Sequence, residues 1–148
     1  MRAPALGLRC ALSKNGNCWT ELGRHFDASW DWRGRLPPAD VLRFLARAPL
    51  VLAPYVDGAT GRRTSLLATL STGARVISSR GHLLDPVFEQ SPVTLATTKD
   101  GFVDAARRAW AVPDTSEQRG RRRAWYHQHH DPRALDDRLL RIVLGAAS

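Results

Sequence analysis

Two short apolar runs near the middle of the chain are separated by a polar loop and one further apolar segment. The runs cover residues 51–53 and 76–77, and each has the length of a buried strand. The segment between them, LLATL, follows Thr64 and Ser65 and stops at Gly73, which is typical of a short helix. This order predicts a βαβ unit with both strands buried in a parallel sheet.

The pattern before this unit predicts another helix. Leu36-Pro37-Pro38 suits a helix start, because proline is favoured in the first turn. Arg43 and Arg47 take the solvated face of this helix, and Pro49 ends it. The apolar positions at helical spacing are Val41, Leu42, Leu45 and Ala48. Nearer the N-terminus, we expect strands at residues 6–12 and 30–33 and a short helix at residues 19–25.

After the unit, the pattern predicts one strand and three helices. The strand covers residues 93–96, and Thr97 or Thr98 caps a helix that runs through Trp110. Asp114 and Glu117 have capping-box spacing and open a basic helix over RGRRRAWYHQHH. The last helix follows Asp131-Pro132 and carries an apolar stripe of Leu135, Leu139, Ile142 and Val143.

This alternation of strands and helices indicates the fold class. We expect an α/β fold, with a Rossmann-like three-layer arrangement of a small parallel sheet and helices on both faces. The last helices are expected to pack across the sheet. The chain has 148 residues and shows no repeat or linker, so a single domain over residues 1–148 is predicted.

Composition and charge narrow the classes of partner. The net charge is +8, which favours an anionic partner such as a nucleotide, a nucleic acid or an acidic membrane surface. Cys10 and Cys18 lie outside any CxxC spacing, and we expect them to be reduced thiols. The first residues lack the apolar core of a signal peptide, and no apolar run approaches membrane-spanning length, so we expect a cytoplasmic protein.

The loop after the first central strand is the best candidate for a binding site. It follows a strand at its carboxyl end, where open α/β sheets bind ligands. Arginines and free N–H groups at the start of the next helix favour a phosphate there, whereas the structural alternative is an exposed glycine-rich turn. The candidate residues are Asp57, Gly58, Arg62, Arg63, Thr64 and Ser65.

These segments carry a family resemblance. APYVDG, SLLATLSTGARVISSRG and WRGRLPPADVLRFLARAPLVLAPY resemble the donor-binding, C-terminal domain of GT-B glycosyltransferases of the large "group 1" family. The resemblance is specific from Trp32 to Gly81. It implies that a nucleotide-diphosphate sugar lies against the loop and helix as the substrate, and we expect no other cofactor.

The resemblance also assigns roles to single positions. Arg35 lies in the turn that passes beside the nucleobase in the family, and Asp57 matches the acidic residue that starts the loop. His82 follows a strand at the ligand-binding edge, where it could reach a phosphate or a sugar. The family commonly holds the ribose with a glutamate on the helix after the loop, but Ala68 occupies that place here.

The resemblance leaves the acceptor site without residues. GT-B enzymes place the acceptor and the usual catalytic base in a first domain or in the cleft beside it, and this chain has no room for that domain. Two explanations stay open: a truncated sequence, or an acceptor domain supplied by another chain. The chain is therefore expected to be incomplete, with unknown catalytic residues, and enzymatic activity is favoured only by the resemblance. The alternative is a non-catalytic remnant or a partner-dependent half of such an enzyme.

Two other clusters, one of histidines and one of arginines, are weaker candidates for a site. His127, His129 and His130 have a spacing that matches no known metal pattern, so no metal site is expected. The basic run at residues 119–123 could contact the phosphates of a nucleic acid or an anionic membrane, but such a run is more often a solvated helix face. A basic nucleic-acid-binding protein is the third hypothesis, and the least favoured.

Overall fold

The computed structural model describes residues 33–145, which form an α/β fold around three parallel strands. The strands are β1 (Val51–Ala53), β2 (Val76–Ser79) and β3 (Thr94–Ala96), in the order β1-β2-β3. Val51 pairs with Val76, and Ile77 pairs with Thr94. The predictions for residues 6–12, 19–25 and 30–32, and for Cys10 and Cys18, lie outside the described residues.

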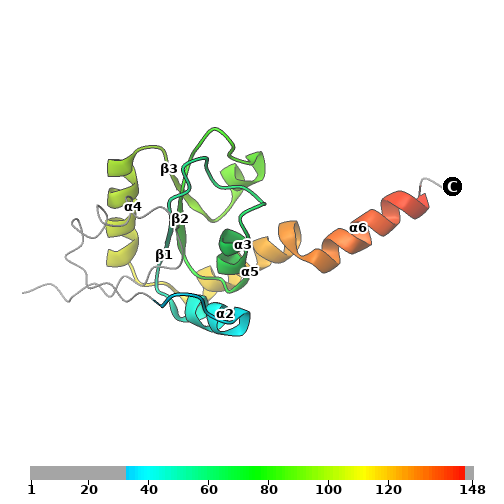
Figure 1. Cartoon of the computed structure of the whole chain (residues 1–148), viewed down its shortest axis with the longest axis horizontal. Helices are drawn as coiled ribbons and strands as arrows, with labels where there is room; N and C mark the ends of the chain where they lie inside the picture. The colour runs from blue at the N-terminus through cyan, green and yellow to red at the C-terminus, as the bar shows by residue number, and fades with distance from the viewer. Residues whose placement is uncertain (1–32, 146–148) are drawn as a thin grey trace, which may run out of the picture.

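Helices cover both faces of this sheet (Figure 1). Helix α4 packs on one face, and α3 and α5 lie on the other. The helices and the 3₁₀ turn η1 have these bounds: α2 Pro38–Arg47, α3 Thr64–Ser71, η1 Pro86–Gln90, α4 Lys99–Ala111, α5 Ser116–His130 and α6 Pro132–Gly145. The predicted βαβ unit is therefore confirmed as β1-α3-β2, and the parallel sheet with helices on both faces is confirmed as well.

The core is divided by the sheet into two apolar clusters. On the α4 face, Ile77 packs with Phe102, Val103 and Ala106. The α3 face is centred on Phe88, Leu66 and Leu70, all fully buried. The central strand β2 is buried through Ser78, whose hydroxyl donates to the Ala53 carbonyl at 2.9 Å. A buried polar side chain thus stands in the central strand with its hydrogen bond satisfied.

The cap of α5 differs from the prediction. Thr115, not Asp114, is the N-cap residue, and Gln118 completes a reciprocal capping box with it. The Asp114 carboxylate is bound elsewhere: it accepts two hydrogen bonds from Arg122 Nη2, at 2.5 and 2.6 Å. Its oxygens also lie 3.3 Å from Arg119 Nη2 and 3.5 Å from Arg75 Nη2. We call these four residues the Asp114 cluster.

Helix α6 contradicts the expected packing of the last helices. It follows α5 but projects away from the sheet (Figure 1). The side chains of Leu139, Ile142 and Val143 are about 60% exposed or more, so the apolar stripe does not pack across the sheet. Among the described helices, none combines the length and apolar composition that crossing a bilayer requires.

Candidate functional site at the carboxyl edge of the sheet

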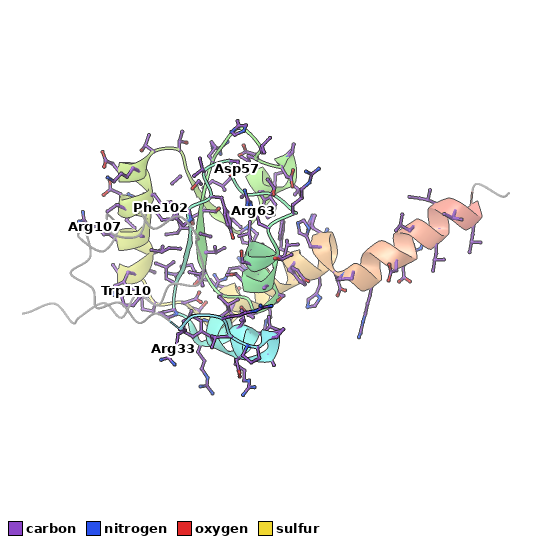
Figure 2. The ribbon with its side chains drawn as sticks, viewed as in Figure 1. Arg33, Asp57, Arg63, Phe102, Arg107 and Trp110 are labelled. Carbon is purple, nitrogen blue, oxygen red and sulfur yellow. The ribbon has the colours of Figure 1, made fainter. Side chains whose placement is uncertain are left out.

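Three loops meet at the edge where the parallel strands end. They follow Ala53, Ser79 and Ala96, the last residues of β1, β2 and β3. Figure 2 shows Asp57 and Arg63 at this edge, whereas Arg33 lies near the opposite end of the sheet. Because all three strands run the same way, their carboxyl ends place these loops side by side.

The first two loops pack against each other through their backbones. Gly58 has φ +106°, and a Cβ there would lie 2.8 Å from the Gly81 nitrogen. A Cβ on Gly81 would in turn lie 2.3 Å from the carbonyl carbon of Asp57. The Leu83 N–H donates to the Asp57 carbonyl at 2.8 Å. Glycine is therefore required at both positions, because no side chain fits between the loops.

A carboxylate holds the middle of the first loop. Asp85 Oδ2 accepts a hydrogen bond from the Gly61 N–H at 2.5 Å, and the Asp85 N–H donates to the Ala59 carbonyl at 3.0 Å. His130, at the end of α5, lies beside this contact and stacks on Phe88 with ring centroids 5.5 Å apart. Burial, and then the neighbouring His129, lower the pKa of His130, and Asp85 opposes that shift.

Arg63 is held from two sides. Its guanidinium forms an ion pair with Asp57 and lies 4.9 Å from the centroid of the Tyr55 ring. The Tyr55 hydroxyl shares a hydrogen bond of 2.7 Å with Ser65 Oγ. Burial raises the pKa of Tyr55, and the Ser65 hydrogen bond and the Arg63 charge oppose that rise. Asp57, Arg63 and Ser65 are thus brought together through Tyr55, which the sequence analysis did not select.

The start of α3 leaves donors available. Arg63 is the N-cap residue and makes no side-chain cap, and its carbonyl accepts from the N–H groups of Leu66 and Leu67. The hydrogen bonds found within residues 33–145 leave the N–H groups of Thr64 and Ser65 without a backbone acceptor. The Arg62 side chain is exposed, and no partner for its guanidinium occurs in this part of the chain. Two amides and one arginine are therefore free to meet an anion.

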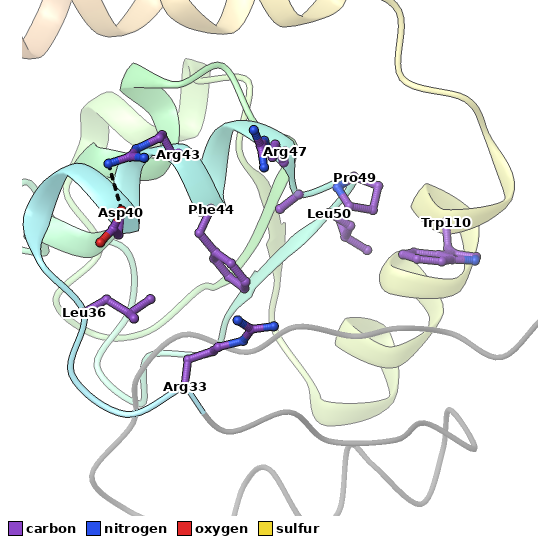
Figure 3. A pocket seen from close by; sticks show the side chains of 10 residues that line it. Arg33, Leu36, Asp40, Arg43, Phe44, Arg47, Pro49, Leu50 and Trp110 are labelled. Carbon is purple, nitrogen blue, oxygen red and sulfur yellow. Dashed lines mark ion pairs between the residues drawn. The ribbon is translucent and has the colours of Figure 1, made fainter.

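Two other predicted site residues, His82 and Arg35, lie at opposite ends of the sheet. His82 is exposed on the second loop, next to the Leu83 contact with the first loop. Arg35 instead lies between Arg33 and Leu36, which line a cavity of about 680 Å³ beside the start of β1 (Figure 3). The structure therefore brings His82 to the loop but does not bring Arg35 there.

A second cavity lies at the carboxyl edge itself. Its volume is about 290 Å³, and it is lined by residues that follow β1, β2 and β3 together with the start of α4. Arg80 in its wall is paired with Glu89. None of the wall residues was predicted from the sequence as a binding-site residue. The position of several of them at the carboxyl end of a strand could have indicated that role. The wall residues include Tyr55, Ser79, Arg80, Thr98, Lys99 and Phe102.

The three histidines near the end of α5 each contact a different partner. His127 Nδ1 lies 2.7 Å from Asp131 Oδ2, and His129 Nδ1 lies 2.9 Å from the Trp125 carbonyl oxygen. His130 stacks on Phe88 instead. Within residues 33–145, no group of three histidine, cysteine or acidic side chains gathers as a metal ion would need.

Comparison of the chain with known proteins identifies no relative. No family model matches the chain, no curated protein is significantly similar to it, and no solved structure matches its fold significantly. What the edge can bind is therefore inferred from its residues and their geometry.

Proposed function

We propose that the carboxyl edge binds the diphosphate of a nucleotide-sugar, and that the chain is the donor-binding part of a GT-B-type glycosyltransferase. The observation that carries this proposal is the exposed Arg62 beside the amides of Thr64 and Ser65, none of which has a partner among residues 33–145. A helix N-terminus carries about half a positive charge, and arginine adds a full one. The resemblance of the same segment to group 1 glycosyltransferases supports the choice of a diphosphate over another anion.

Arg63 has a different role from Arg62 in this proposal. Its pairing with Asp57 and its contact with the Tyr55 ring fix its position before any ligand arrives. A fixed cation costs less ordering on binding than a mobile one does. Asp57 also cancels part of its charge, so Arg62 and the α3 amides supply most of the attraction.

The site fits the leaving-group side of a transfer reaction. In that reaction the bond between the sugar's anomeric carbon and the diphosphate oxygen breaks while a bond to an acceptor oxygen forms. The acceptor loses a proton, and the departing nucleoside diphosphate gains negative charge, which Arg62 and the α3 amides stabilise. We assign no general base, because an acceptor domain in a further segment or a partner chain would supply it.

Ala68 affects how strongly the donor binds. It lies on α3 where the family commonly has the ribose-binding glutamate, and alanine offers no side-chain acceptor for the ribose hydroxyls. Binding should therefore depend mostly on the diphosphate. Diphosphates of ribonucleosides and of 2′-deoxyribonucleosides, such as UDP and dTDP, are then expected to differ less in affinity than in a site with that glutamate.

The test is a thermal-shift panel with UDP, GDP, ADP and dTDP, followed by calorimetry with the best ligand. Arg62→Ala should weaken binding by about 1.5–3 kcal/mol, the scale of a hydrogen bond to a charged group. Arg63→Ala should also weaken it, by about 1–3 kcal/mol. Arg141→Ala on α6 is the matched control, because it removes an exposed arginine far along the chain. Equal affinities in Arg62→Ala and wild type would refute the assignment, as would the absence of any nucleotide shift.

Activity requires a separate measurement. The purified chain is mixed with the nucleotide-sugar and with candidate acceptors, and release of the nucleoside diphosphate is followed. Binding without release would support the remnant or partner-dependent alternative. Release that depends on Arg62 would support a transferase.

A further inference from the structure

A groove between α4 and α5, at the amino end of the sheet, collects four arginines. It has a volume of about 440 Å³, and Arg75, Arg108, Arg121 and Arg122 line it together with Gln118. Arg75 directly precedes β2, so this groove lies at the opposite end of the strands from the loop of Arg62. No acidic residue is among the described residues that line it. We call it the arginine groove.

The charge around the arginine groove is unbalanced. In the Asp114 cluster, one carboxylate contacts three guanidinium groups, which leaves two positive charges uncompensated there. The side chains of Arg75 and Arg122 are only 14% and 8% exposed, so water screens them poorly. Arg121 pairs with Glu117 at 2.6 Å but is 77% exposed, and no partner for the Arg108 side chain occurs within residues 33–145.

We propose that the arginine groove binds a small anion with several phosphate groups. Arg75 and Arg122 also donate to the backbone carbonyls of Val112 and Gly73, so their hydrogen bonds have acceptors. What the arginine groove lacks is negative charge, and a bound anion supplies it. Guanidinium groups recognise phosphate oxygens through parallel N–H donors, and Arg108 and Arg121 stand on two helices that face across the groove. The volume lies in the range of small-ligand pockets.

The lining favours a phosphate compound over a nucleic acid. Proteins that hold single strands stack the bases on aromatic side chains, and none of the described lining residues is aromatic. Fewer arginines of the basic run at residues 119–123 are available to contact a nucleic acid than the sequence suggests. Arg119 and Arg122 turn inward to Asp114, and Arg119 Nη1 donates to the Ala46 carbonyl at 2.5 Å. Only part of the run remains for a long polyanion.

Tripolyphosphate is the probe, titrated by calorimetry at low salt. The titrations use chains that carry Arg62→Ala, so that the carboxyl-edge loop contributes little. Adding Arg108→Ala and Arg121→Ala should weaken binding about tenfold for each arginine. The matched control adds Arg133→Ala and Arg141→Ala, which remove the same charge from α6 and should change affinity less than threefold. All four side chains are exposed, so the variants are expected to fold.

Three results would overturn the proposal. One is the absence of tripolyphosphate binding, and another is an equal loss in the groove and control variants, which would indicate general attraction to a basic protein. The third is a single-stranded RNA 12-mer that binds more tightly than tripolyphosphate and depends on Arg108 and Arg121. Nucleotide binding at the carboxyl edge should be unchanged by the groove substitutions, so the two proposed sites succeed or fail separately.

Discussion

Replacing Asp114 by asparagine should destabilise the fold strongly. The substitution keeps the shape of the side chain but removes the charge shared by Arg75, Arg119 and Arg122. Arg122 is the most affected, because its side chain is 8% exposed and Asp114 accepts both hydrogen bonds of its Nη2 atom. Removing one partner of a buried ion pair costs about 3–5 kcal/mol, since the remaining charge stays buried.

This loss is large compared with the stability of an ordinary domain. Domains are stable by about 5–15 kcal/mol, so a loss of about 3–5 kcal/mol removes at least about a fifth of the total. Urea unfolding followed by tryptophan fluorescence measures it. With a slope of about 2 kcal/mol per molar urea, the midpoint should fall by about 1.5–2.5 M. The buffer must contain chloride only, because phosphate or sulfate would bind the exposed arginines.

Glu117 supplies the control for this prediction. It also pairs with an arginine of α5, but both Glu117 and Arg121 are more than 70% exposed. Glu117→Gln should therefore change the unfolding free energy by less than about 1 kcal/mol, as exposed ion pairs do. If Asp114→Asn cost no more than Glu117→Gln, the three arginines would not depend on Asp114, and the reasoning would be refuted.

Substitutions at three further positions test other contacts. Gly81→Ala should cost about 1–3 kcal/mol in urea unfolding, because its Cβ would overlap the Asp57 backbone, and it should also weaken nucleotide binding by displacing the loop. Thr115→Ala should cost about 1 kcal/mol through the lost cap, whereas Thr115→Ser should cost much less. His130 has a lowered pKa, so the stability due to its neutral form is present above about pH 6.5 and is lost as pH falls through the lowered value. His130→Phe should remove that part of the pH dependence measured by urea unfolding.

Each of these expectations has a contrary outcome. A Gly81→Ala chain with wild-type stability would show that the two loops separate easily. Equal losses in Thr115→Ala and Thr115→Ser would place the effect outside the capping box. If His130→Phe left the pH dependence of the unfolding free energy unchanged, other groups would be responsible for the loss of stability in acid.

The sequence predicted the backbone of the site better than its side chains. The runs at residues 51–53 and 76–77 and the helix after Thr64 were predictable because the turn residues that bound each apolar run distinguish strand from helix, which periodicity alone cannot do for short runs. The pairing of Arg63 with Asp57 could not be predicted, since they are six positions apart in a loop and only the folded path of the loop brings them together. Arg35 shows the same limit, because its place depends on where the chain runs before α2.

Competition for one side chain explains the wrong cap. Asp114 has the chemistry and spacing of an N-cap residue, yet three arginines from two parts of the chain bind its carboxylate. Thr115, one residue later, caps the helix instead. Helical periodicity could have distinguished the arginines of the basic run that face the fold from those that face solvent. Arg119 and Arg122 are three residues apart and share a face, whereas Arg121 lies on another.

The projecting helix α6 has a consequence for how the molecule opens. An isolated helix of 14 residues is barely stable in water, and little of α6 rests on the body of the fold. Its amide hydrogens should therefore exchange with deuterium in seconds to minutes, whereas those of β2 should exchange only when the whole sheet unfolds. The body of the fold and α6 would then differ in their free energies of opening. A ligand that slows exchange in α6 would show that the helix packs against a surface in the bound state.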